Sequence, residues 1–112
     1  MMYEYNAQYV SNYDGDTIKF IADMGFGISY KITVRVSSID TPELRAKDPV
    51  EKVKAYEAKE FVREALLGAD KIVIKTFKDK KGKYGRYIAE VLYDGLNLGE
   101  ELIGKELAVV YK

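Results

Sequence analysis

Alternating apolar and polar positions indicate that the first third of the chain is mainly β-structure. The alternation is clearest from Ile28 to Ile39, where apolar side chains recur at every second position and Arg35 falls on the polar face. Residues 3–13 and 17–24 show a similar pattern, and the Asp14-Gly15 pair between them is typical of a turn. These patterns predict three consecutive strands.

The period then changes to that of an amphipathic helix. After a charged loop over residues 44–52, apolar side chains recur at three- and four-residue spacing from Val53 to Gly68. Beyond it, the pattern predicts a strand, a basic loop, a strand, a short helix and a final strand (residues 71–77, 78–85, 86–93, about 97–104 and 107–111). This order is typical of a five-stranded OB-fold Greek-key barrel with about two helices, so we predict a mainly β (α+β) fold. Residues 1–112 are expected to form one domain.

Composition narrows the chemistry that such a domain can perform. The chain of 112 residues has no cysteine and no histidine, so zinc-thiolate sites and cysteine nucleophiles are excluded, and acid–base and metal chemistry falls to carboxylates. The net charge is zero, which argues weakly against a nucleic-acid partner. Basic residues nevertheless outnumber acidic ones by seven to one between residues 71 and 86. This segment is either a ridge that binds a phosphate backbone or a solvated, lysine-rich hairpin.

Membrane association is not expected. No apolar run approaches the ~18 residues that span a bilayer. Residues 1–5 lack the basic and apolar regions of a signal peptide. The expected location is therefore open: cytoplasmic, or secreted with a leader removed.

The first motif with candidate chemistry is the sequence Asp-Gly-Asp-Thr at residues 14–17. Taken alone, it is more typical of a plain turn between two strands. In the functional interpretation, Asp16 leaves the turn at the start of a strand and points into a cleft as a ligand for a hard cation.

The second motif runs from Val34 to Glu43 and carries Arg35, Asp40 and Glu43. Its Thr-Pro step predicts a sharp bend, although a helix N-terminus would have the same composition. Strict alternation puts Arg35 and Asp40 on opposite faces of a strand. Both can serve one site only if a bulge or bend intervenes, and residues 37–38 are the expected place.

The third motif is Lys-Tyr-Gly-Arg at residues 83–86. It is either a loop tip with incidental charges or a phosphate clamp, in which the Arg86 guanidinium binds phosphate in a bidentate manner beside Lys83 and Tyr84. Together the three motifs supply three carboxylates and two guanidiniums, the set that a metal-dependent phosphodiesterase needs.

The order and spacing of these motifs resemble the staphylococcal nuclease (thermonuclease) family. The matching segments are DGDT, R-x4-DTPE, VEK, YEA, KYGR and DG-x3-GEEL (residues 14–17, 35–43, 50–52, 56–58, 83–86 and 94–102). The resemblance covers the chain from about Tyr9 to Tyr111. It implies an OB-fold barrel, and the third, C-terminal helix of that family is expected to be absent.

The resemblance also implies a cofactor and its ligands. Asp16, Asp40 and the Thr41 carbonyl would hold Ca²⁺. Glu43 would orient or deprotonate the attacking water.

The resemblance assigns the basic residues to the substrate. Arg35 and Arg86 would bind the scissile phosphate, and Lys83 and Tyr84 would hold a neighbouring phosphate. The implied activity is that of a monomeric Ca²⁺-dependent endonuclease on DNA and RNA, preferably single-stranded, that leaves 3′-phosphate ends. Two alternatives stay open: a non-catalytic OB-fold module that binds nucleic acid or protein, and a structural or host-interaction domain with a vestigial site.

Overall fold

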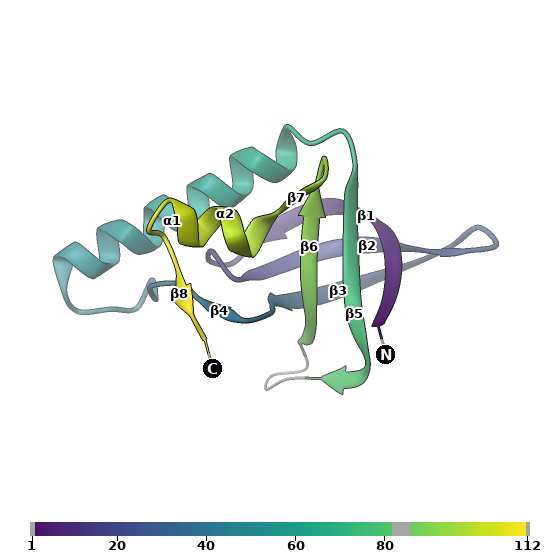
Figure 1. The fold of residues 1–112 in the computed structure, drawn as a ribbon, viewed down its shortest axis with the longest axis horizontal. Coiled ribbons are helices and arrows are strands. Elements are labelled where there is room, and N and C mark those ends of the chain that lie inside the picture. The colour runs from purple at the N-terminus through teal and green to yellow at the C-terminus, as the bar shows by residue number, and fades with distance from the viewer. Residues whose placement is uncertain (1, 82–85, 112) are drawn as a thin grey trace.

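Five strands close into a barrel in the computed structural model, which describes residues 2–81 and 86–111 (Figure 1). They are β1 (Met2–Asn12), β2 (Thr17–Gly25), β3 (Ile28–Val36), β5 (Ile72–Lys81) and β6 (Tyr87–Tyr93). Neighbours in the order β3-β2-β1-β5-β6 pair antiparallel, and a parallel pairing of β3 with β6 closes the barrel. This is the order of an OB-fold barrel, so the predicted fold class is confirmed.

Shorter elements cover and complete the barrel. They are β4 (Ile39–Asp40), α1 (Pro49–Leu67), β7 (Leu96–Asn97), α2 (Leu98–Gly104) and β8 (Val109–Val110). The second helix matches its predicted range, and the Asn97 side chain caps it by accepting a hydrogen bond from the Glu100 amide. β7, which the sequence pattern did not reveal, pairs with the end of β6 across the Asp94-Gly95 turn.

The first helix begins earlier than predicted, at Pro49 instead of Val53. Asp48 caps it by accepting a hydrogen bond from the Val50 amide, and proline suits the first helical position. The first turn is exposed to solvent, so it carries none of the apolar spacing on which the prediction rested. The predicted charged loop is correspondingly shorter.

Two strand ends differ from the prediction by three residues or more, and the last strand, Val109–Val110, is shorter than the predicted residues 107–111. β3 ends at Val36 instead of Ile39, because Ser38 adopts a positive φ of 66°, outside the β region, and the chain bends there. β5 continues to Lys81 instead of ending at residue 77, because it resumes pairing with Tyr87 of β6 after a register shift. Backbone pairing of this kind leaves no signal in the apolar pattern.

The inward faces of the strands and one face of each helix form the core. Fully buried side chains come from β2, β3, β5, β6 and both helices (Ile18, Phe20, Val34, Ile74, Val91, Val62, Leu98 and Leu102). They occur at every second position of the strands, as the alternation predicted. This core fixes the polar ends of β2 and β3 against each other, and the candidate site lies there.

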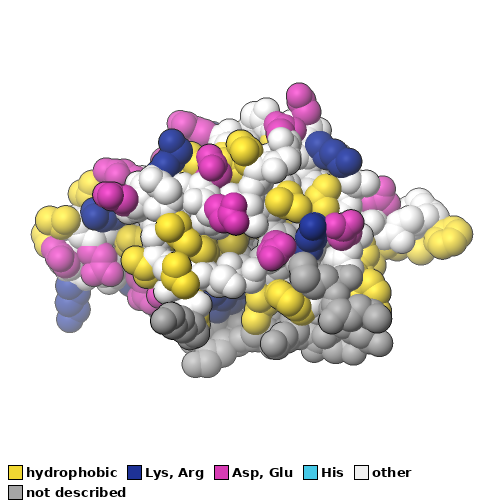
Figure 2. Space-filling view, viewed as in Figure 1, with side chains coloured by type: hydrophobic (Ala, Val, Ile, Leu, Met, Phe, Trp, Pro, Cys, Tyr) yellow, Lys and Arg dark blue, Asp and Glu magenta, His cyan; other side chains and the backbone are white. Residues whose placement is uncertain are grey.

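The β2–β3 hairpin extends beyond the barrel (Figure 1). Ile28 and Tyr30, which the alternation assigned to the same face as buried Ile32, are therefore more than half exposed. Phe26 at the hairpin tip is fully exposed, and Figure 2 shows hydrophobic side chains at that end of the molecule. On the same face, acidic and basic side chains are interspersed. None of the described helices is long and apolar enough to cross a membrane.

Candidate active site

The turn before β2 is organised by the Asp14 side chain. Its Oδ1 atom accepts hydrogen bonds from the amides of Asp16 at 3.0 Å and Thr17 at 2.9 Å. The Asp16 carbonyl in turn accepts a hydrogen bond of 2.9 Å from the Val36 amide, which fixes the turn to the end of β3. The turn interpretation and the functional interpretation of this motif are therefore compatible.

Gly15 allows this turn to pack tightly against two other segments. A Cβ atom at this position would lie 2.8 Å from Thr41 Cγ2 and 2.9 Å from Ala58 Cβ, closer than side chains pack. Asn12 ties the same turn to α1, because its side-chain amide donates to the carbonyls of Asp14 at 2.9 Å and Lys59 at 3.1 Å. The turn is thus held between the barrel, the Thr41 segment and the helix.

Asp16 is a buried carboxylate, with only 6% of its surface exposed. Its Oδ2 accepts the Thr41 amide at 3.3 Å, and its Oδ1 accepts the Thr17 hydroxyl at 3.4 Å. The pKa of Asp16 is raised to about 6, first by burial and then by the hydrogen bond and charge of Asp14, against the lowering effects of the Thr41 amide and Arg35. Its ionised form therefore favours a nearby positive charge.

The Arg35 guanidinium lies between two carboxylates. Its Nη2 atom is 3.7 Å from Asp16 Oδ2 and 3.5 Å from Asp40 Oδ1. Arg35 pairs with Thr17 in the β2–β3 register, and the bend at Ser38 brings Asp40 to the same side of the sheet. The bend that the sequence required at residues 37–38 is present, and it removes the conflict with strict alternation.

The C-terminal strand covers this cluster from the other side. β8 pairs with β4, with Val109 opposite Asp40, and the Tyr111 amide donates to the Ser38 carbonyl at 3.0 Å. The Tyr111 ring lies 4.8 Å from the Arg35 guanidinium carbon, within the range of a cation–π contact. Sequence motifs cannot reveal this contact, because its partners lie at opposite ends of the chain.

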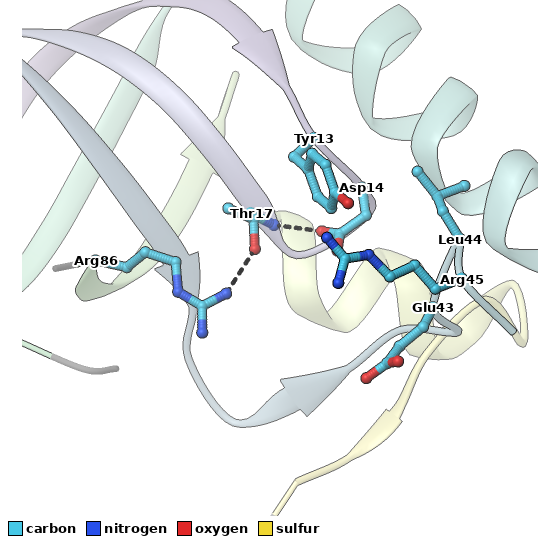
Figure 3. A pocket seen from close by; sticks show the side chains of 7 residues that line it. All are labelled: Tyr13, Asp14, Thr17, Glu43, Leu44, Arg45 and Arg86. Carbon is cyan, nitrogen blue, oxygen red and sulfur yellow. Dashed lines mark hydrogen bonds between the residues drawn. The ribbon is translucent and has the colours of Figure 1, made fainter. Parts of the chain in front are cut away.

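Beside this cluster is an open cleft of about 470 Å³ (Figure 3). It is lined by Tyr13, Asp14, Thr17, Glu43, Leu44, Arg45 and Arg86. Arg86 Nη1 donates to the Thr17 hydroxyl at 2.9 Å, and Thr17 in turn lies against Asp16. Thr17 therefore links the Arg86 side of the cleft to the buried carboxylate. The Asp-Gly-Asp-Thr motif contained this threonine, but sequence reasoning gave it no role.

The structure distributes the predicted residues over two adjoining places. Glu43 and Arg86 line the cleft, and the Glu43 carboxylate is exposed. Asp16, Arg35, Asp40 and Thr41 form the cluster beside it, through the contacts given above (Asp16–Arg35, Arg35–Asp40 and Thr41–Asp16). Lys83 and Tyr84 lie outside the described residues. Tyr13 and Arg45 line the cleft as well, although no motif singled them out.

The donor atoms of the cluster are compatible with a hard cation. Asp16 and Asp40 both contact one positive group, the Arg35 guanidinium, so their charges already converge. The Thr41 hydroxyl is buried and has no hydrogen-bond partner among the described residues. Over the same residues, no group of three or more acidic side chains forms a metal-binding cluster. The available protein ligands are therefore two carboxylates and the oxygen atoms of Thr41. All are oxygen donors, which hard cations prefer.

The fold and site define an OB-fold protein with carboxylates and guanidiniums gathered at one end of strands β2 and β3. The family model described as "Staphylococcal nuclease homologue" matches residues 33–112, and the chain belongs to this family. It is similar to endonuclease YncB of Bacillus subtilis (strain 168), with 35% identity over 98 residues. It is also 34% identical over 98 residues to the SPbeta prophage-derived endonuclease YokF of the same strain.

These relatives are longer proteins. Each match covers 87% of this chain, but only 44% of YncB and 31% of YokF. The chain thus spans less than half the length of the curated relatives that it matches.

Proposed function

We propose that the protein is a Ca²⁺-dependent endonuclease that hydrolyses phosphodiester bonds in DNA and RNA. The observation that carries this proposal is one connected network: Arg35 contacts Asp16 and Asp40, and Thr17 joins Asp16 to Arg86 in the cleft. Membership of the staphylococcal nuclease family and similarity to two proteins named endonucleases support it. We further propose a preference for single strands, 3′-phosphate products and action as a monomer.

In this proposal, Asp16, Asp40 and the Thr41 carbonyl hold Ca²⁺. A bound divalent cation supplies stabilisation of the negative charge that develops on phosphate oxygens. Asp16 is held in place for this role by the Thr41 amide and the Thr17 hydroxyl. Asp40, which is about half exposed, is held by the pairing of β4 with β8.

Two guanidiniums bind the scissile phosphate. Arg86 is held at the cleft wall by its hydrogen bond to Thr17, and Arg35 is held by its two carboxylate contacts. A guanidinium presents planar, forked donors that match phosphate oxygens, and donors fixed before the reaction stabilise developing charge most effectively. Lys83 and Tyr84 are proposed to hold a neighbouring phosphate.

Glu43 is proposed to orient the attacking water and to take its proton. The exposed Glu43 carboxylate lines the cleft, and among the described residues its side chain forms no hydrogen bond or ion pair. It is therefore accessible to a water molecule in the cleft. Attack on phosphorus forms the new P–O bond as the bond to the leaving oxygen breaks.

A non-catalytic nucleic-acid-binding module is the second candidate. One observation favours it: the Arg35 guanidinium lies between the two carboxylates that would ligate the cation. In such a module, this ion-pair cluster has a structural role and the cleft alone contacts the ligand.

Cleavage of a labelled single-stranded DNA and a labelled RNA, with Ca²⁺ and with a chelator, tests the proposal. We expect Ca²⁺-dependent cleavage by the wild type and a loss of about a hundredfold or more in Glu43→Ala, as is typical when a general base is removed. Circular dichroism confirms that the variant is folded. Cleavage that is equal in Glu43→Ala removes this mechanism. Binding without cleavage by the folded wild type establishes the second candidate.

A further inference from the structure

Two side chains that line the cleft carry hydrogen-bonding groups but have no part in the proposed chemistry. Tyr13 precedes the turn and is 57% exposed, and Arg45 follows Glu43 and is also exposed. Among the described residues, neither side chain forms a hydrogen bond, ion pair or ring contact. A phenol ring and a guanidinium on one cleft wall are therefore available to a ligand.

Both side chains extend from ordered backbone. The Tyr13 amide donates to the Thr17 carbonyl at 2.9 Å, and the Ala46 amide donates to the Glu43 carbonyl at 3.1 Å, which closes the turn that carries Arg45. Figure 3 shows Arg86 and Thr17 on one side of the cleft, with Arg45 extending toward Tyr13 and Asp14 on the other. Tyr13 and Arg45 thus lie at one part of the cleft, and Thr17 connects this part to Arg86.

Building on the proposed nuclease function, we propose that Tyr13 and Arg45 form a second nucleotide subsite. It takes the nucleotide next to the scissile phosphate, on the side away from Arg86. Arg45 binds the phosphate of that nucleotide in a bidentate manner, and the Tyr13 ring stacks on its base. Glu43 lies two residues before Arg45 in the chain and lines the same cleft.

This subsite would produce the proposed preference for single strands without a strongly basic surface. Stacking on Tyr13 requires a base whose face is free, which single strands offer and duplexes do not. The net charge of zero leaves little long-range attraction for a phosphate backbone, so local contacts must supply the affinity. Because every base can stack on an aromatic ring, the subsite distinguishes single strands from duplexes but does not select a base sequence.

The test compares an eight-nucleotide single strand with a dinucleotide that contains only the scissile phosphate. We expect Tyr13→Ala and Arg45→Ala to lower kcat/KM on the octamer about tenfold more than on the dinucleotide. Tyr13→Phe should retain the wild-type ratio, because phenylalanine keeps the stacking face. Arg45→Ala should also lower the salt slope of octamer binding by about one.

Two substitutions serve as matched controls. Lys47→Ala, the control for Arg45→Ala, removes one positive charge from the same loop. Tyr56→Ala, the control for Tyr13→Ala, removes a similarly exposed tyrosine (52%) from α1. Neither residue lines the cleft. Both should leave the ratio of the two substrates at the wild-type value. Equal losses on both substrates, or none, in Tyr13→Ala and Arg45→Ala overturn the subsite.

The subsite and the nuclease proposal can fail separately. If the wild type cleaves neither substrate, the nuclease proposal fails, and octamer binding is then measured by fluorescence anisotropy with and without Ca²⁺. Weaker binding by Tyr13→Ala and Arg45→Ala than by their controls supports the subsite, and unchanged binding overturns it.

Discussion

Burial of the Asp16 carboxylate raises its pKa and lowers the stability of the fold at neutral pH. The carboxylate is almost inaccessible to solvent, and its contacts with Thr41 and Arg35 only partly offset the loss of hydration that raises its pKa. A buried carboxylate whose contacts only partly replace its hydration lowers the free energy of unfolding at neutral pH. Perturbed groups beside a cleft are typical of functional sites.

Asp16→Asn should therefore stabilise the chelator-treated protein at neutral pH. The folded pKa is raised from 3.8 to about 6, so the stability that protonated Asp16 supplies is fully present below pH 3.8 and is lost as the pH rises through about 6. Asparagine removes the charge, and we expect the free energy of unfolding at pH 7.5 to rise by about 1–3 kcal/mol. Urea unfolding measures this change. Asp40→Asn, which changes an exposed carboxylate in the same way, is the control. If Asp16→Asn were less stable than the wild type, the destabilising effect assigned to the buried Asp16 charge would be wrong.

At the scale of elements, the site depends on where two strands end. β3 stops at Val36 because of the bend at Ser38, and β8 returns from the far end of the chain to pair with Asp40. The Tyr111 ring then covers the Arg35 guanidinium. β8 and the Tyr111 that follows it therefore cover one side of the site as well as completing a two-stranded sheet.

Tyr111→Ala should remove the ring contact that covers the Arg35 guanidinium. Loss of the ring over Arg35 is expected to lower the free energy of unfolding by about 1 kcal/mol, the size of a partly exposed cation–π contact. It should also lower kcat/KM, because Arg35 loses one of the contacts that orient it. Tyr111→Phe keeps the ring and should behave as the wild type in urea unfolding and in cleavage. A phenylalanine variant as impaired as the alanine variant would assign the effect to the hydroxyl instead.

At the scale of the whole molecule, the site joins segments from both ends of the chain, so a bound cation should stabilise the entire fold. Ca²⁺ at a hundredfold excess over its dissociation constant is expected to raise the free energy of unfolding by about 2.7 kcal/mol. Thermal denaturation with Ca²⁺ and with a chelator measures this gain. Lys47→Ala should show the full gain and Asp16→Asn should lose it. An equal gain in Asp16→Asn would place the cation elsewhere.

Much of this arrangement could be predicted from local patterns. Alternation identified β2 and the inner part of β3, helical spacing identified most of α1, and the predicted range of α2 was confirmed. The motifs pointed to Asp16, Arg35 and Asp40, which the structure brings together. The predictions of these strands and helices succeeded because burial periodicity and turn chemistry are properties of neighbouring residues. The exposed first turn of α1 and the paired end of β5 carry no such signal.

The sequence by itself thus determined the barrel, the chemical character of its site and the need for a bend at residues 37–38. Only the tertiary structure decided which partners meet. It placed Tyr111 over Arg35, joined Asp16 to Arg86 through Thr17, and set Tyr13 and Arg45 on one cleft wall. The reason is physical: each of these contacts joins segments whose distance in space is set by closure of the barrel, and strand pairing and packing fix that distance without leaving a local pattern.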